Sequence, residues 1–168
     1  MAELLLPKTH QDFALTAYWD SFYKKRDTKT FEYYGEYSDH CVLLHKYCRL
    51  KDKILHVGCG NSRLSEDLYD AGYNAILNID TSDVVIRQMT DRNRHKRPQL
   101  IFQKIDVTDT AFDDAHFDVV LDKGTLDAMT ADEHGLDQQT INAMFAESKL
   151  QLILKGIRFI HSSIYKYI

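Results

Sequence analysis

The most constraining feature of this sequence is a regular alternation of short β-type runs with helical stretches, which begins at Lys53. The expected strands cover residues 53–57, 75–79, 100–104, 117–121 and 158–164, and the expected helices between them cover residues 63–71, 83–93 and 137–154. Strands that alternate with helices form βαβ units, whose right-handed crossovers leave the strands parallel. We therefore predict an α/β fold in three layers, with five parallel strands between two layers of helices.

Ahead of this region the sequence predicts two helices joined by an aromatic link. Residues 11–25 carry apolar side chains at helical spacing, namely Leu15, Tyr18, Trp19 and Phe22. A second helix is expected over residues 38–47, and the link at residues 31–37 is rich in tyrosine. Because 168 residues fit about one domain, we predict a single domain, with a helical cap over residues 1–50 and the sheet over residues 51–168. Both helices are expected to pack near the carboxyl edge of the sheet.

Composition and charge exclude several classes of protein. Apolar residues make up 44% and charged residues 27% of the chain, which excludes a disordered or collagen-like polypeptide. With 21 basic and 25 acidic residues the net charge is -4, so neither a nucleic acid nor an anionic membrane is expected as a partner. No apolar run approaches the ~20 residues of a membrane span, and the N-terminus lacks the pattern of a signal peptide.

The cysteines Cys41, Cys48 and Cys59 are too few, and odd in number, for a disulfide framework. They are interpreted as reduced thiols of a cytoplasmic protein, and no metal site is expected because no cluster of ligands accompanies them. A basic stretch at residues 87–97 is interpreted as the solvated end of a helix, where positive charge suits the helix dipole.

The first expected strand ends in a glycine turn, Gly58-Cys59-Gly60-Asn61-Ser62. Two glycines between a strand and a helix allow the backbone to approach a nucleotide closely. The third glycine of the dinucleotide-binding pattern is absent, since Arg63 stands in its place. By itself the turn indicates either a nucleotide site or a tight β–α connection.

Acidic residues follow the next three expected strands. Asp80 ends the second strand about 20 residues after the glycines, where a carboxylate can bind both ribose hydroxyls. Asp106 and Val107 follow the third strand, where they could face an adenine, and Asp122 with Lys123 follows the fourth. Each aspartate alone is also explained by a helix cap or a turn. Together, however, these features share the carboxyl edge of the sheet, where open α/β sheets bind their ligands.

The same strings resemble those of the class I S-adenosylmethionine-dependent methyltransferases. The most specific is the string at residues 117–128, which is similar to the branch of the elongation factor 1-alpha lysine methyltransferases. Tyr18-Trp19 and Phe31-Glu32-Tyr33-Tyr34-Gly35 match that branch as well, and the resemblance runs from about residue 5 to residue 159. It implies a Rossmann-like methyltransferase sheet and S-adenosyl-L-methionine as the cofactor. It also implies protein-lysine methylation, with elongation factor 1-alpha as the expected protein substrate.

The resemblance further implies a set of cofactor-binding residues, which are Trp19, Tyr23, Tyr33, Gly58, Gly60, Asp80, Asp106, Val107 and Lys123. The glycines would pass the methionine part of the cofactor, and the three aromatic residues belong to a segment that closes over it. Tyr33 stands where tryptophan is usual. His56 stands where class I enzymes often have an acid, so one anchoring carboxylate is missing.

Methyl transfer from a sulfonium is an in-line displacement, so the main task of the protein is to position the acceptor. A lysine acceptor must also lose a proton, since its ordinary pKa is about 10.4. An aromatic, water-poor pocket would lower that pKa, and a carboxylate could accept the proton. The candidate acids are Asp122, Asp127 and Glu32. The sequence does not choose among them, and each is also explained as a helix cap.

Two other functions stay open at this point. One is a catalytically silent module that keeps the cofactor pocket, and the other is a nicotinamide-dependent oxidoreductase, which the missing third glycine disfavours. In addition, the methyltransferase fold normally ends in an antiparallel hairpin beside strand five. The sequence stops about four residues after the fifth expected strand, so we expect that hairpin to be missing and turnover to be poor.

Overall fold

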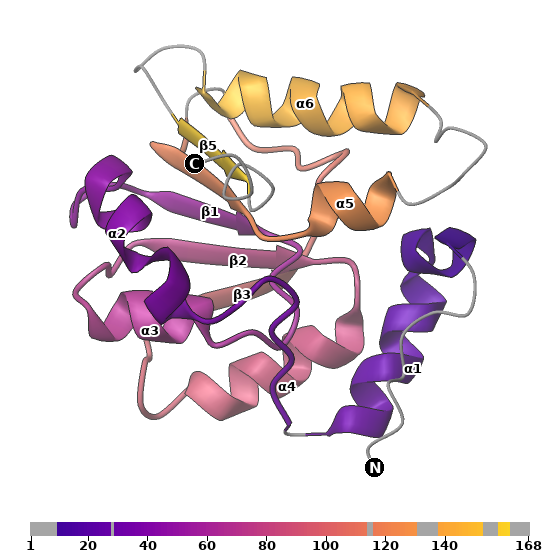
Figure 1. Ribbon diagram of the computed structural model, residues 1–168, viewed down its shortest axis with the longest axis horizontal. Coiled ribbons are helices and arrows are strands. Elements are labelled where there is room, and N and C mark those ends of the chain that lie inside the picture. Colours follow the sequence, from indigo (N-terminus) through magenta and orange to yellow (C-terminus); the bar gives the residue numbers. More distant parts are fainter. Residues whose placement is uncertain (1–9, 28, 114–115, 131–137, 153–157, 162–168) are drawn as a thin grey trace.

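A computed structural model describes residues 10–27, 29–113, 116–130, 138–152 and 158–161 of the chain (Figure 1). The elements in chain order are η1 (His10–Ala14), α1 (Thr16–Arg26), α2 (Tyr37–Tyr47), β1 (Ile54–Val57), α3 (Leu64–Asp70), β2 (Ile76–Asp80), α4 (Asp83–Asn93), β3 (Ile101–Lys104), β4 (Val119–Asp122), α5 (Thr125–Met129), α6 (Gln138–Leu152) and β5 (Arg158–His161). They form three layers, in which α3 and α4 lie on one side of the sheet and α6 lies on the other (Figure 1).

The sheet is parallel throughout, with the strand order β3-β2-β1-β4-β5, which confirms the predicted α/β architecture. The central strands β1 and β4 are buried along their whole length, as expected when helices cover both faces of a parallel sheet. The chain first winds outward from β1 to β3 and then crosses back to β4, on the other side of β1. Open α/β sheets bind their ligands at such a switch point, outside the carboxyl ends of the strands.

Side chains of β1 alternate between two apolar clusters, one on each face of the sheet. Leu55 and Val57 pack on the side of α6, in the cluster that contains Met144. Ile54 belongs to the cluster on the other face, which also contains Phe22 of α1 and Leu68 of α3. The N-terminal helices therefore share the core of the sheet.

The two N-terminal helices occupy different places. α1 packs against α4, and the Thr16 hydroxyl donates to Thr81 Oγ1 (3.1 Å) just after β2, so this helix lies at the carboxyl edge as predicted. α2 instead packs along α3 and ends beside the residues that precede β2, where the Tyr73 hydroxyl donates to the Cys48 carbonyl (3.3 Å). The prediction that both helices pack near the carboxyl edge is therefore wrong for α2. This helix is held in its place by its contacts with α3 and by burial of Leu44 in the apolar cluster on the α3 face of the sheet.

Two further details differ from the sequence-based expectations, and a third lies outside the described residues. The helix α5 was not predicted, because five residues are too few to show a helical period. Leu15 is 53% exposed, since it occupies the N-cap position of α1, before the helix begins, and does not face the core. The predicted end of the fifth strand at residues 162–164 lies outside the described residues. Within the described ranges, no helix is long and apolar enough to cross a membrane.

Candidate functional site

A cavity of about 260 Å³ opens at the carboxyl edge of the sheet, where the turns after β1 and β4 meet. All of the residues predicted to bind the cofactor line it, and these are Trp19, Tyr23, Tyr33, Gly58, Gly60, Asp80, Asp106, Val107 and Lys123. The three candidate proton acceptors behave differently. Within the described part of the chain, Glu32, Asp122 and Asp127 are not among the lining residues.

The glycine turn after β1 depends on glycine at both of its predicted positions. Gly58 and Gly60 have φ angles of 55° and 52°, in the left-handed region that side chains disfavour. A Cβ atom on Gly58 would lie 1.8 Å from the Thr125 hydroxyl oxygen, and one on Gly60 would lie 2.8 Å from the Tyr23 hydroxyl oxygen. Because these two residues have no side chains, α5 and α1 can pack closely against the turn. A ligand can approach its backbone for the same reason.

Asp80 ends β2 with its carboxylate oriented by two backbone groups. The Gly60 N–H donates to Oδ2 (3.0 Å) and the Ser82 N–H donates to Oδ1 (2.9 Å), so the acid connects the glycine turn with the start of α4. Burial raises the pKa of Asp80, against these backbone hydrogen bonds, which lower it. A buried carboxylate at this edge is well placed to accept hydrogen bonds from a polar ligand, which would compensate its loss of water.

Asp106 and Val107 form the wall that follows β3. Asp106 Oδ1 accepts hydrogen bonds from the backbone N–H (2.9 Å) and the hydroxyl (2.7 Å) of Thr108, which fixes the turn. Val107 is buried at 7% exposure and contributes an apolar surface to the cavity. The pair therefore offers one polar and one apolar group side by side.

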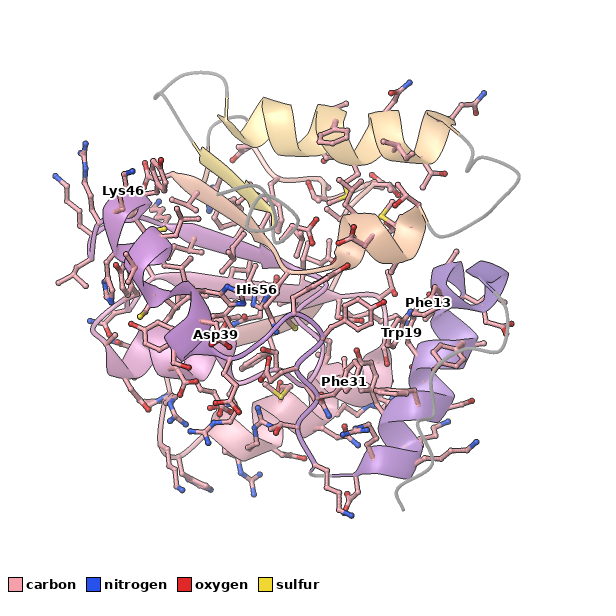
Figure 2. The ribbon with its side chains drawn as sticks, in the orientation of Figure 1. Phe13, Trp19, Phe31, Asp39, Lys46 and His56 are labelled. Carbon is pink, nitrogen blue, oxygen red and sulfur yellow. The ribbon has the colours of Figure 1, made fainter. Side chains whose placement is uncertain are left out.

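Aromatic residues of the N-terminal part form the other side of the cavity. The rings of Trp19 and Tyr23 are stacked with centroids 5.9 Å apart, and the Trp19 indole N–H donates to the Phe13 carbonyl (2.7 Å). Figure 2 shows Phe13 and Trp19 close together beside α1. Phe13 and Phe31 also line the cavity and were not among the predicted site residues. Phe31 belongs to the aromatic link at residues 31–37, which was the sequence feature that could have identified it as a site residue.

Of the candidate acids, Asp122 serves as the cap of α5. Its carboxylate accepts hydrogen bonds from the backbone N–H groups of Gly124 (3.0 Å), Thr125 (2.7 Å) and Leu126 (3.1 Å), and the residue is 1% exposed. Such a carboxylate stabilises the first turn of a helix. The structure therefore supports the capping interpretation of Asp122.

The other two candidate acids also have partners within the protein. Asp127 interacts with the Tyr34 hydroxyl, and burial together with this acid raises the pKa of that tyrosine. Glu32 forms an ion pair with Lys123 (2.5 Å). Both carboxylates thus have structural contacts, and the sequence could not show these because the partners are distant in the chain.

His56 is buried on the face of β1 that carries α3. Its Nδ1 lies 2.8 Å from Ser65 Oγ and 3.2 Å from Asn78 Oδ1. The Asn78 amide donates to the Ile101 carbonyl (3.0 Å), which leaves its oxygen facing His56, so Nδ1 carries the proton. Burial, together with the charge of Lys123, lowers the pKa of His56 to about 4, so the ring is neutral near pH 7. At the position where class I enzymes often have an acid, the strand thus holds an uncharged imidazole.

Comparisons with known proteins agree with this geometry. The model of the methyltransferase domain family matches residues 54–150. The eEF1A lysine and N-terminal methyltransferase of Bos taurus is 52% identical over 143 residues, which are 85% of this chain and 20% of that protein. EEF1A lysine methyltransferase 4 of Mus musculus is 35% identical over 162 residues, which are 92% of this chain and 63% of that protein. The chain thus spans about a fifth of the length of the first of these relatives.

Solved structures show the same fold. The PH0226 protein from Pyrococcus horikoshii OT3 has a TM-score of 0.66 and 25% identity, with 86% of this chain and 64% of that chain covered. The glycopeptide N-methyltransferase MtfA in complex with sinefungin has a TM-score of 0.62 and 18% identity, with 77% and 55% covered. With a family match over more than half of its length and the predicted residues gathered in one cavity, the chain belongs to the S-adenosylmethionine-dependent methyltransferases.

Proposed function

We propose that this chain transfers methyl groups from S-adenosylmethionine to lysine side chains of elongation factor 1-alpha. The observation that carries the proposal is the cavity at the switch point of the sheet, which gathers every residue predicted to bind the cofactor. The acceptor protein is supported by the relatives, since those at 52% and 35% identity are named for methylation of eEF1A lysine.

The residues of the cavity fit this cofactor. The left-handed turn at Gly58 and Gly60 exposes backbone to a bound amino-acid group, and the buried Asp80 carboxylate offers acceptors to ribose hydroxyls. Val107 supplies an apolar surface for a flat base. When bound, the cofactor supplies an activated methyl group on a positively charged sulfur.

The chain's own residues position the acceptor and exclude water. Trp19, Tyr23 and Phe31 form an apolar wall, and a lysine amine that enters beside them loses hydration. Desolvation disfavours the charged form of an amine and so lowers its pKa, which favours the neutral nucleophile. Since Asp122 caps α5 and Glu32 pairs with Lys123, we propose that this desolvation lets the acceptor amine release its proton to solvent water rather than to either of those two acids.

A reducing compartment fits the proposal. Cys41, Cys48 and Cys59 are free thiols, and Cys48 and Cys59 are buried. We therefore propose that the protein works in the cytoplasm, where thiols remain reduced.

The test is methyl transfer from labelled S-adenosylmethionine to purified elongation factor 1-alpha, with the labelled residue located by mass spectrometry. We expect label on a lysine side chain, and loss of the label with Asp80→Ala. Label only on the α-amino group would refute the lysine assignment. Cofactor binding without label on any protein would instead support the silent module.

A further inference from the structure

The carboxylate of Glu32 bridges the two turns that form the floor of the cavity. Oε2 accepts a hydrogen bond from the Ser62 hydroxyl (2.7 Å), and Oε1 accepts one from the Arg63 backbone N–H (2.7 Å). Both donors belong to the turn after β1. Lys123 Nζ, from the turn after β4, donates to the same Oε2 (2.5 Å). One side chain of the N-terminal part thus connects two turns that are about 60 residues apart in the chain.

Neither member of this ion pair is well solvated. The side chain of Glu32 is 16% exposed and that of Lys123 is 8% exposed. Burial would raise the pKa of Glu32, but the hydrogen bonds from Lys123, Arg63 and Ser62 outweigh it and hold that pKa below its usual range. The acid is therefore anionic at neutral pH and neutralises the lysine. Removal of one partner would leave the other charge poorly compensated.

The residues around Glu32 are held to the same two turns. We call residues 29–35 the strap. The Asn61 side chain accepts from the Phe31 N–H (3.0 Å) and donates to the Lys29 carbonyl (2.9 Å), while Lys123 Nζ also donates to the Gly35 carbonyl (3.4 Å). Because Phe31 lines the cavity, the strap is part of its wall. The ion pair therefore lies where the strap, both turns and the cavity meet.

Lys123 lines the cavity, whereas Glu32 does not. We propose that Glu32 is a positioning residue which acts through Lys123: it neutralises this lysine and holds it across the two turns, so that the cavity accepts a ligand with a positively charged sulfur. The inference rests on the proposed function and deepens it, because it explains how a cavity with a lysine in its wall can bind a cation.

The electrostatic reasoning predicts selectivity between two related ligands. S-adenosylmethionine carries a positive sulfur, whereas S-adenosylhomocysteine has a neutral one, and the two share the remaining charged groups. An unneutralised Lys123 would repel only the first through its sulfur. When two unit charges lie roughly 10 Å apart in a partly buried site, their interaction changes the binding affinity by about five- to tenfold. A purely structural role of Glu32 would weaken both ligands equally.

The experiment is calorimetric titration of the 168-residue chain and its variants with each of the two compounds. For Glu32→Gln we expect the preference for S-adenosylmethionine over S-adenosylhomocysteine to fall about five- to tenfold. Adding Lys123→Met to this variant should restore the wild-type ratio. Lys123→Met alone should shift the ratio in the opposite direction, because it leaves Glu32 negative, and this provides a second reading if Glu32→Gln does not fold.

Asp109→Asn is the matched control, since it removes one negative charge from an exposed residue that follows the cavity wall. It should leave the ratio unchanged. An unchanged ratio in both Glu32→Gln and Lys123→Met, with both compounds still bound, would overturn the role of Glu32 and leave the cofactor assignment intact. A wild-type chain that binds neither compound would refute the proposed function, and with it this inference.

Discussion

His56 should make the stability of this protein sensitive to mild acid. Burial, aided by the charge of Lys123, lowers the pKa of His56 in the folded state from the ordinary 6.5 to about 4. The unfolded chain therefore binds more protons between these values, and the contribution of His56 is fully present above pH 6.5 and lost as the pH falls toward 4. The whole shift corresponds to about 3 kcal/mol, of which roughly 2 kcal/mol is lost between pH 7 and pH 5.

The physical cause is the burial of the imidazole ring. Nδ1 already donates toward Ser65 and Asn78, so a protonated ring would add a charge and a further N–H at a residue that is 1% exposed. No anionic partner compensates that charge within hydrogen-bond distance in the described part of the chain. Protonation must therefore favour the unfolded state.

The perturbation is His56→Gln, which removes the titrating ring and keeps an amide that can donate to Asn78. Urea unfolding at about pH 7 and pH 5 gives the free energy of unfolding for each variant. The wild type should lose about 2 kcal/mol more than His56→Gln over this range. His95→Gln, which removes an exposed histidine, controls for the substitution itself. Equal losses in the wild type and His56→Gln would refute the reasoning.

Four further predictions concern the site. Asp80→Ala should weaken S-adenosylhomocysteine binding about ten- to hundredfold, while Asp109→Ala leaves it near the wild-type value, and calorimetry showing equal dissociation constants would contradict the ribose assignment. Gly58→Ala should destabilise the fold by about 2 kcal/mol or more in urea unfolding, because its Cβ would lie 1.8 Å from the Thr125 hydroxyl, and Thr125→Ala in the same chain should recover part of the loss. Asp122→Ala should reduce the free energy of unfolding by about 1–3 kcal/mol through the unpaired N–H groups of α5. Methyl transfer by Asp122→Asn should keep the wild-type pH profile, and loss of the acid limb, where the rate falls as a catalytic base is protonated, would instead identify Asp122 as the proton acceptor.

The local pattern of the sequence determined the α/β architecture and the edge of the sheet at which the site lies. The period of apolar residues changes from helical to strand-like over a few positions, and the parallel sheet follows from this alternation. Gly58, Asp80 and Asp106 lie at strand ends, so the topology alone brings them to one edge. These three residues line one cavity, so strand-end reasoning was sufficient to place them together.

Tertiary structure alone decided what the charged side chains do. Asp122, Asp127 and Glu32 were equivalent as candidate acids in the sequence, yet the fold gives the first a helix cap and the last a lysine 91 residues away. The position of α2 and the presence of the short helix α5 were likewise decided by packing in the folded protein. A strand or helix can be predicted from the spacing of apolar residues within one segment. The partner of a carboxylate instead depends on which segments the finished fold brings within hydrogen-bond distance.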